Sequence, residues 1–252
     1  MSGILYGLGV GPGDPELITL KAHRLLNECN VIAYPAPDDG QSFARSIVAS
    51  YLRPEQIEIP IIIPMRTQRF PAQNVYDRAA RDISTHLDAG NDVAVLCEGD
   101  PFFYGSFMYL FERLSLDYTT RIVPGVSSLM ASAAALGRPI AARNDVLSVI
   151  PAPLDDAAIS RRLERGEAIA FIKVGRHFER VRRLIDEAGL TGSAGYLERV
   201  SLGNEKIMAL EDVSADEVPY FSMILIYRGA EDWISKLPLV GVEEPVDAVQ
   251  PA

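Results

Sequence analysis

The chain has 252 residues, of which 48% are hydrophobic and 23% charged, with a formal net charge of -10 at pH 7. This composition is typical of a folded globular protein and excludes a disordered or collagen-like chain. The length fits one large domain or two of about 100–150 residues each. The negative charge excludes nucleic acid as the main partner, because the chain would repel a polyanion.

The two cysteines, Cys29 and Cys97, lie in apolar stretches, and no group of Cys and His has the spacing of metal ligands. We therefore predict neither a disulfide nor a zinc site. Residues 1–6 lack the cationic start of a leader, and every apolar run is shorter than the about 18 residues of a membrane span. These features predict a cytoplasmic protein that does not bind membranes.

Strand and helix patterns alternate along the first half of the chain. Apolar runs predict strands, and helical spacing of apolar residues predicts the helices between them. The predicted strands are 4–10, 31–34, 57–63 and 92–97, and the predicted helices lie at about 18–29, 42–51, 76–87 and 102–114. This alternation is typical of an α/β fold with a mostly parallel sheet.

A polar break at residues 116–120 is the predicted linker to a second α/β domain. In that domain we expect strands at 121–123, 146–150, 168–174, 194–198, 206–210 and 222–227, and helices near 129–135, 157–165 and 178–188. Several strands follow one another directly, which favours a mixed sheet. The predicted domains are therefore 1–115 and 121–240, followed by a tail at 241–252.

Three glycine-containing loops, at residues 7–13, 99–101 and 124–128, each follow a predicted strand and precede a helix. The first does not match the dinucleotide fingerprint, because the position of its last glycine falls on Pro12 or Asp14. In a parallel sheet such loops meet at one edge and can hold a small ligand. Since no phosphate-cradling Gly-Lys-Ser/Thr loop is present, a polar nucleoside fits this edge better than a triphosphate.

The sequences of residues 9–14, 98–106 and 124–128, in this order and spacing, resemble those of the tetrapyrrole methylases, a family that uses S-adenosylmethionine. The resemblance extends from about residue 3 to residue 230. Four further stretches are similar to family members that act on C20 of the tetrapyrrole precorrin-2: 31–37, 107–110, 173–177 and 219–223.

The resemblance implies a homodimeric enzyme with S-adenosylmethionine in a cleft between two α/β domains and the tetrapyrrole above it. It places Pro12 by the opening of the site. The residues that it implies for donor binding are Gly99, Asp100 and Phe103 from the first domain and Ser127 and Ser128 from the start of the second, with Val174 and Ser222 as further neighbours. One departure is Pro35 after Tyr34, where relatives that methylate uroporphyrinogen often carry an Asp, so a proton acceptor there cannot be transferred.

The implied chemistry is a direct displacement in which C20 attacks the sulfonium methyl group, and it requires neither a metal nor a catalytic triad. Two residues are candidate proton acceptors: Tyr104, which follows the loop at residues 99–101, and His177, at a predicted strand end. Basic side chains in or near predicted loops could bind the carboxylates of precorrin-2. These are Arg45, Arg53, Arg66, Arg69, Arg138, Arg143, Lys173 and Arg176.

Three alternatives to methylation of metal-free precorrin-2 stay open. Within the same chemistry, the substrate could be the cobalt-containing analogue, cobalt-factor II. From another class, the chain could be a tetrapyrrole carrier without catalytic activity. A nicotinamide oxidoreductase is the third alternative, which the missing fingerprint at Pro12 and Asp14 disfavours.

Overall fold

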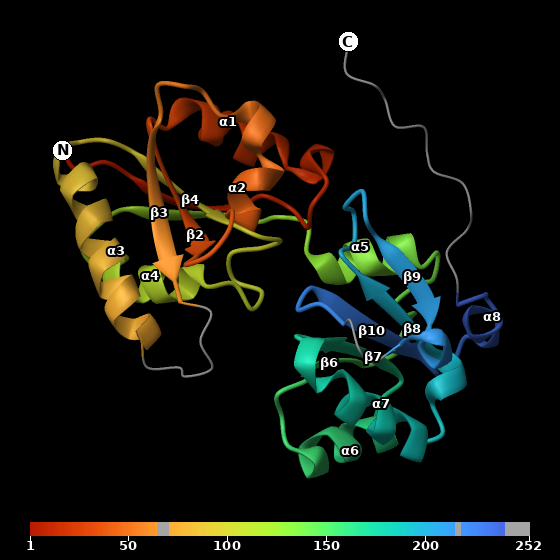
Figure 1. The fold of residues 1–252 in the computed structure, drawn as a ribbon. Helices are drawn as coiled ribbons and strands as arrows, with labels where there is room; N and C mark the ends of the chain where they lie inside the picture. Colours follow the sequence, from red (N-terminus) through yellow and green to blue (C-terminus); the bar gives the residue numbers. More distant parts are fainter. Residues whose placement is uncertain (65–70, 215–217, 240–252) are drawn as a thin grey trace. The chain divides into compact units, whose positions relative to one another are not determined.

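A computed structural model describes residues 1–64, 71–214 and 218–239 (Figure 1). The chain divides into two compact units, Met1–Ser128 and Leu129–Ala252, each built around a sheet of its own. Among the residues described, no helix is long and apolar enough to cross a membrane.

The first unit contains a five-stranded sheet whose strand pairs are all parallel. Its strands are β1 (Leu5–Gly9), β2 (Val31–Pro37), β3 (Ile57–Ile63), β4 (Val93–Cys97) and β5 (Thr120–Val123), in the spatial order β3-β2-β4-β1-β5. Strands β1 and β4 are buried along their whole length. Their continuous apolar sequences are those expected of central strands covered on both faces.

Two pairs of helices cover the first sheet (Figure 1). They are α1 (Leu20–Glu28), α2 (Phe43–Ile47), α3 (Pro71–Asp88) and α4 (Phe107–Leu114). Apolar residues of α1 and α2 pack with one set of alternate strand residues, such as Leu8 and Leu96. Residues of α3 and α4 pack with the other set, such as Leu5 and Val95. The two-residue period of the strands thus assigns each helix pair to one face.

The second unit contains a mixed sheet in the order β6-β7-β10-β8-β9. Its strands are β6 (Leu147–Pro151), β7 (Ala168–Ile172), β8 (Ala194–Glu198), β9 (Lys206–Ala209) and β10 (Ser222–Tyr227). Only the β6 and β7 pair is parallel among the strand pairs of the described residues. A parallel first sheet and a mixed second sheet are both as the sequence predicts.

Helices also pack on both faces of the second sheet. They are α5 (Ser128–Ala135), α6 (Asp156–Arg165), α7 (Phe178–Glu187) and α8 (Asp232–Ser235). The core between the sheet and helices α6 and α7 includes Phe171, Phe178 and Tyr196. On the other face, Leu136, which follows α5, packs over Gly195, and Ile234 of α8 packs with Tyr227.

The predicted domain boundary at residues 116–120 is wrong. The strand after it, β5, pairs in parallel with β1 from Leu5↔Thr120 to Leu8↔Val123 and so completes the first sheet. The loop at residues 124–128 therefore belongs to the first unit, and the division falls between Ser128 and Leu129. The polar break is a surface connection between α4 and β5, which sequence polarity alone does not distinguish from a linker. The predicted tail, 241–252, lies outside the residues described.

Candidate functional site

The three glycine loops meet at the carboxyl edge of the first sheet, because β4, β1 and β5 are neighbours in it. Gly99 donates its backbone N–H to the carbonyl of Gly11 at 2.7 Å, and Gly11 donates to Gly99 at 3.4 Å. The carboxylate of Asp100 accepts the N–H of Gly125 at 3.1 Å. Hydrogen bonds thus join all three loops, as predicted from the order of the motifs, and we call this set of loops the glycine junction.

The glycine junction leaves no space for a side chain at two positions, Gly9 and Gly125. A Cβ atom on Gly125 would lie 2.0 Å from the carbonyl oxygen of Gly99, and one on Gly9 would lie 2.5 Å from the N atom of Gly125. These neighbours are backbone atoms that cannot rotate away. Gly99 itself has φ +61, a left-handed conformation that glycine adopts without strain. The three main chains therefore approach more closely than side chains would allow.

Asp100 holds the junction in shape. Its Oδ1 accepts the N–H of Phe102 at 2.9 Å, and its Oδ2 accepts the N–H of Gly125. Both carboxylate oxygens are therefore bound to backbone amides, which fixes the turn after β4 against the turn after β5. The resemblance implies that Asp100 binds the donor, and the structure adds that its carboxylate joins two turns, a role that the motif does not reveal.

The other predicted residues of the first unit surround the junction. Pro12 is buried in the loop after β1, and Ser127 and Ser128 begin the turn into α5, within van der Waals distance of where a Cβ on Gly99 would lie. Phe103 is half-buried, and its ring meets that of Tyr104 edge to face with centroids 5.1 Å apart. Tyr104 is 44% exposed and has φ 58, a strained conformation for a residue other than glycine.

The predicted residues of the second unit lie where β7 ends and β10 begins. Val174 is completely buried in the core, so neither its side chain nor its main chain is exposed to a ligand. Ser222 is 3% exposed, accepts the N–H of Gly175 at 3.3 Å and donates to the carbonyl of Pro219 at 2.7 Å. Its hydroxyl therefore joins two loops instead of facing solvent.

His177 lies between the short turn Gly175–His177 and α7, and it is half-buried. Burial, followed by the positive charges of Arg180 and Arg176, lowers the pKa of its imidazole. The ring is therefore more readily neutral than that of a solvent-exposed histidine, as a proton acceptor must be.

A buried carboxylate that the sequence analysis does not single out organises the same end of the second sheet. The side chain of Glu198 accepts from the Tyr196 hydroxyl at 2.7 Å and from Arg199 at 2.9 Å, and Lys206 lies 3.3 Å away. Three residues nearby, Lys173, Arg199 and Ser201, have positive φ without being glycine. An acidic residue at the end of an otherwise apolar strand is the sequence signal that could have identified Glu198.

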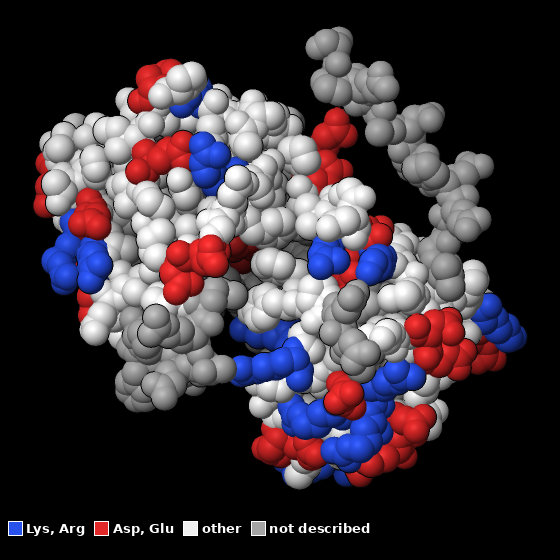
Figure 2. All heavy atoms as spheres, viewed as in Figure 1, with Lys and Arg blue, Asp and Glu red and all other residues white. Residues whose placement is uncertain are grey.

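The basic residues predicted for carboxylate binding have diverse partners. Arg45 pairs with Glu58, Arg53 with Glu55 and Arg143 with Glu231. Arg66 and Arg69 lie outside the residues described. The surface over α6 and α7 carries acidic and basic side chains side by side (Figure 2), including the pair of Arg183 with Asp156. Arginines with such partners have less positive charge to offer a substrate.

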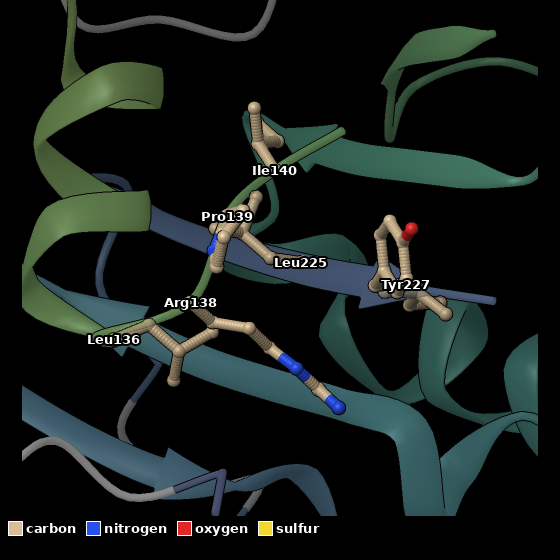
Figure 3. A pocket seen from close by; sticks show the side chains of 7 residues that line it. Leu136, Arg138, Pro139, Ile140, Leu225 and Tyr227 are labelled. Atoms are coloured by element: carbon tan, nitrogen blue, oxygen red, sulfur yellow. The ribbon is translucent and has the colours of Figure 1, made fainter. Parts of the chain in front are cut away.

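Arg138 has a structural role. It is 5% exposed, and its guanidinium donates to the carbonyls of Ile234 at 2.9 Å and Ser193 at 3.4 Å. Burial lowers its pKa. Figure 3 shows a pocket of the second unit with this side chain in its wall and the guanidinium directed away from the hydroxyl of Tyr227. Arg138 is therefore not available to bind substrate carboxylates as predicted, because its guanidinium is buried and bound to main-chain carbonyls inside the unit.

Residues 4–213 match the model of the family described as tetrapyrrole (corrin/porphyrin) methylases. The chain belongs to the tetrapyrrole methylase family. The resemblance carried by the three glycine loops is thereby confirmed.

Relatives within this family are similar over most of the chain. It is 42% identical over 235 residues to the cobalamin biosynthesis protein CobIJ of Mycobacterium tuberculosis, covering 90% of this chain but 46% of that protein, so it spans about half of the relative's length. It is 37% identical to a precorrin-2 C(20)-methyltransferase of Sinorhizobium, covering 97% of it. It is 33% identical to a cobalt-precorrin-2 C(20)-methyltransferase of Salmonella typhimurium, covering 98%.

Solved structures show the same fold. The crystal structure of cobalt precorrin-4 methyltransferase CbiF superposes with a TM-score of 0.69 at 22% identity and covers 92% of this chain and 95% of its own. The uroporphyrin-III C-methyltransferase of Thermus thermophilus, solved with S-adenosylhomocysteine, superposes with a TM-score of 0.64 at 24% identity over 89% of this chain and 97% of its own.

Proposed function

We propose that this protein transfers a methyl group from S-adenosylmethionine to C20 of precorrin-2, a step of cobalamin biosynthesis. The observation that carries the proposal is the 37% identity to a precorrin-2 C(20)-methyltransferase along 97% of that enzyme. The identity to the relative named for the cobalt-containing substrate is lower, at 33%, which favours the metal-free macrocycle.

The glycine junction fits a bound nucleoside. Close approach of the loops after β1, β4 and β5 leaves main-chain N–H and C=O groups, the hydroxyls of Ser127 and Ser128, and the ring of Phe103 to contact the donor. In the second unit, the proposed donor contacts come from the loops at Gly175 and Pro219 that the Ser222 hydroxyl joins, with the buried Val174 supporting the first of them. Asp100 acts mainly by holding Gly125 in place.

The donor supplies a methyl group that its sulfonium already activates for displacement. The protein's own contribution is to align the two reactants and to exclude water, and good alignment alone can lower a barrier by about 7 kcal/mol. No step of this mechanism requires a metal. Among the described residues, no group of three or more His, Cys, Asp or Glu side chains could hold a metal ion.

The test is to incubate the purified protein with S-adenosylmethionine and precorrin-2 under anaerobic conditions and to analyse the macrocycle by mass spectrometry. We expect one added methyl group, at C20 by NMR. A parallel reaction with the cobalt-loaded macrocycle decides between the two substrates. A bound but unmethylated macrocycle would instead indicate a carrier, and protection against unfolding by NAD would indicate the oxidoreductase.

A donor-site variant makes the test specific to the proposed residues. Phe103→Ala should raise the KM for S-adenosylmethionine about tenfold, equivalent to about 1.4 kcal/mol of binding free energy, by removing a ring that contacts the donor. Trp233→Ala removes an exposed aromatic ring from α8 and should leave this KM unchanged. Equal effects of both changes would contradict the assignment of Phe103.

The proposal includes a homodimer in the cytoplasm. The dimer follows from the family resemblance alone, and light scattering after gel filtration tests it. A cytoplasmic location is consistent with the state of Cys29 and Cys97, which are both free and buried, because reducing compartments keep thiols unpaired. Localisation of a fluorescent fusion checks the compartment.

A further inference from the structure

One end of the second sheet combines exposed aromatic rings with positive charge. It is formed where β7 and β8 end and where β9 and β10 begin. In the register of the sheet, Ser222 of β10 is opposite Glu198 of β8, and Glu198 is opposite Lys206 of β9. The basic and aromatic side chains at this end are at least partly exposed, and we call them the basic edge: Lys173, Arg176, Arg199, Lys206, Tyr220 and Phe221.

The rings of Tyr220 and Phe221 are the apolar part of the basic edge. They are 56% and 46% exposed and meet edge to face with centroids 5.3 Å apart. The main chain that carries them is held on two sides. The carbonyl of Phe221 accepts the N–H of Arg199 at 3.0 Å, and a Cβ on Gly175 would lie 3.3 Å from the Cα atom of Tyr220. Two large rings on a fixed main chain thus present apolar surface that a flat ligand can cover.

Positive charge at the basic edge exceeds the negative charge beside it. Arg199 and Lys206 both approach Oε1 of Glu198, at 2.9 Å and 3.3 Å, so one carboxylate is shared by two cations. Residues 173–177 and 198–206 together contain four Lys or Arg and two Glu, in a chain whose net charge is -10. This end of the sheet therefore attracts an anion that the protein as a whole repels.

Backbone strain also marks the basic edge. Lys173, Arg199 and Ser201 have φ of 57, 52 and 63. A left-handed backbone is costly for residues other than glycine, and such conformations cluster where ligands are held. Arg199 thus keeps a long cationic side chain at a position that glycine would occupy with less strain. Its Nη1 binds Glu198, and the planar guanidinium has further N–H donors for a second carboxylate.

The basic edge borders the two loops proposed to contact the donor. Tyr220 directly follows Pro219, and Arg176 directly follows Gly175. The hydroxyl of Ser222 joins these loops, because it accepts the N–H of Gly175 and donates to the carbonyl of Pro219. A ligand on the basic edge would therefore lie beside the proposed donor contacts of the second unit.

We propose that the basic edge binds the tetrapyrrole, an inference that rests on the proposed function. Arg199 and Lys206 bind carboxylate side chains of the macrocycle, and the rings of Tyr220 and Phe221 pack against the face of one of its pyrroles. Glu198 holds both cations in position by binding them from below with a single buried carboxylate. None of these residues takes part in bond making, so they are positioning residues that determine which macrocycle is accepted.

The test measures binding of uroporphyrin III, a stable tetrapyrrole with carboxylate side chains, by its fluorescence in the presence of S-adenosylhomocysteine. Arg199→Gln and Lys206→Gln should each raise the Kd for the porphyrin about tenfold, because each removes a charged hydrogen-bond donor. Both should also make that Kd less dependent on salt concentration, since salt screens the lost charge pair. The Kd for S-adenosylhomocysteine should stay unchanged.

Two further variants separate charge from ring contact. Arg199→Lys keeps the charge and should bind the porphyrin more tightly than Arg199→Gln does. Phe221→Leu removes a ring and should raise the Kd about threefold while leaving its salt dependence unchanged. With precorrin-2 as substrate, each variant that weakens porphyrin binding should raise KM and leave kcat unchanged, as expected for residues that only bind.

Arg183→Gln is the matched control. Arg183 is an exposed arginine on α7 of the same unit, and it pairs with Asp156 and Glu187. Its loss changes the net charge as Arg199→Gln does and should leave the porphyrin Kd and its salt dependence unchanged. Lys206→Gln guards against unfolding, because the side chain is 55% exposed and urea denaturation should show wild-type stability.

The outcomes distinguish the inference from the proposed function. If Arg199→Gln and Lys206→Gln bind the porphyrin as tightly as the wild type, the inference is overturned, whereas methylation of precorrin-2 by the wild type leaves the function standing. An equal weakening by Arg183→Gln also overturns it, since net charge alone would then explain the binding. A wild type that binds the porphyrin at this edge and methylates neither macrocycle overturns the methyl transfer and supports the tetrapyrrole site.

Discussion

The two units form their strand-end loops in different ways. In the first, glycines at positions 9 and 125 let main chains touch, main-chain hydrogen bonds join Gly11 to Gly99, and the Asp100 carboxylate binds backbone amides. In the second, non-glycine residues take left-handed conformations, and side chains such as those of Glu198 and Ser222 hold the loops.

This difference determines how each region tolerates change. Where backbone fills the space, any added side chain collides with atoms that cannot move aside, so the cost is steric. Where side chains hold a strained backbone, the cost of a substitution depends on which hydrogen bond is lost and on whether strain is relieved. The predictions below test that distinction.

The largest effect is expected for Gly125→Ala. The new Cβ would lie 2.0 Å from the carbonyl oxygen of Gly99 and 2.8 Å from the Cα atom of Gly9. Since all three loops would have to separate, we expect a loss of about 3 kcal/mol of unfolding free energy, the upper range for overpacking. Urea denaturation measures it, and titration with S-adenosylhomocysteine shows whether donor binding is lost.

The matched control is Gly203→Ala in the second unit. A Cβ there meets no atom within 4 Å, so the unfolding free energy should change by less than about 0.5 kcal/mol. If Gly125→Ala were as well tolerated as this change, close main-chain packing would not be what maintains the junction.

The next effect is expected for Glu198→Leu. The change leaves the hydroxyl of Tyr196 without its acceptor in the core and removes the anion that Arg199 and Lys206 share. We expect a loss of about 2 kcal/mol, the cost of an unsatisfied buried polar group. Tyr196→Phe removes the other partner and should cost less.

A double-mutant cycle gives the sharper measurement. With both changes, no unsatisfied hydroxyl remains, so the combined loss should be smaller than the sum of the single losses by about 1 kcal/mol. Strictly additive losses would mean that the hydrogen bond between Tyr196 and Glu198 does not contribute to stability.

Backbone strain in the second region can be measured at Ser201, which has φ 63 and donates its N–H to Glu205 at 2.6 Å. Ser201→Gly and Ser201→Ala lose the same hydroxyl but differ in their tolerance of a left-handed backbone. The Gly variant should be more stable than the Ala variant by about 1 kcal/mol in urea denaturation. The opposite order would show that this conformation carries no strain.

The sequence predicts most of the fold because its signals are local. Glycine turns after apolar runs place the three loops at one sheet edge, and that order alone predicts their meeting. The predicted domain boundary is wrong because β5 pairs with β1, which joins residues more than 100 positions apart. The polarity of the sequence near residue 118 carries no information about that pairing. The sequence does not predict the burial of Arg138 for a similar reason, because its partners Ser193 and Ile234 are distant in sequence.

The predicted site residues show the same limit. Their positions near strand ends follow from the motifs, but the use of each side chain depends on tertiary contacts. Val174 and Ser222, which the resemblance gives as neighbours of the donor, illustrate this, because both are buried and the Ser222 hydroxyl binds Gly175.

The smallest effect concerns a partly exposed carboxylate in the first region, in contrast to the buried Glu198. Arg45 binds Glu58 through Nε at 2.5 Å and Nη2 at 2.8 Å, and this hydrogen bonding, with that of Tyr34, lowers the pKa of Glu58 below its ordinary value of 4.5. The stabilisation is therefore present above pH 4.5 and is lost as the pH falls through the lowered pKa. Because both side chains are partly solvated, this stabilisation should stay below about 1 kcal/mol.

Urea denaturation at pH 7 and below pH 4 should show a smaller loss of stability on acidification for Glu58→Gln than for the wild type. An equal loss in both would mean that solvent screens this pair completely.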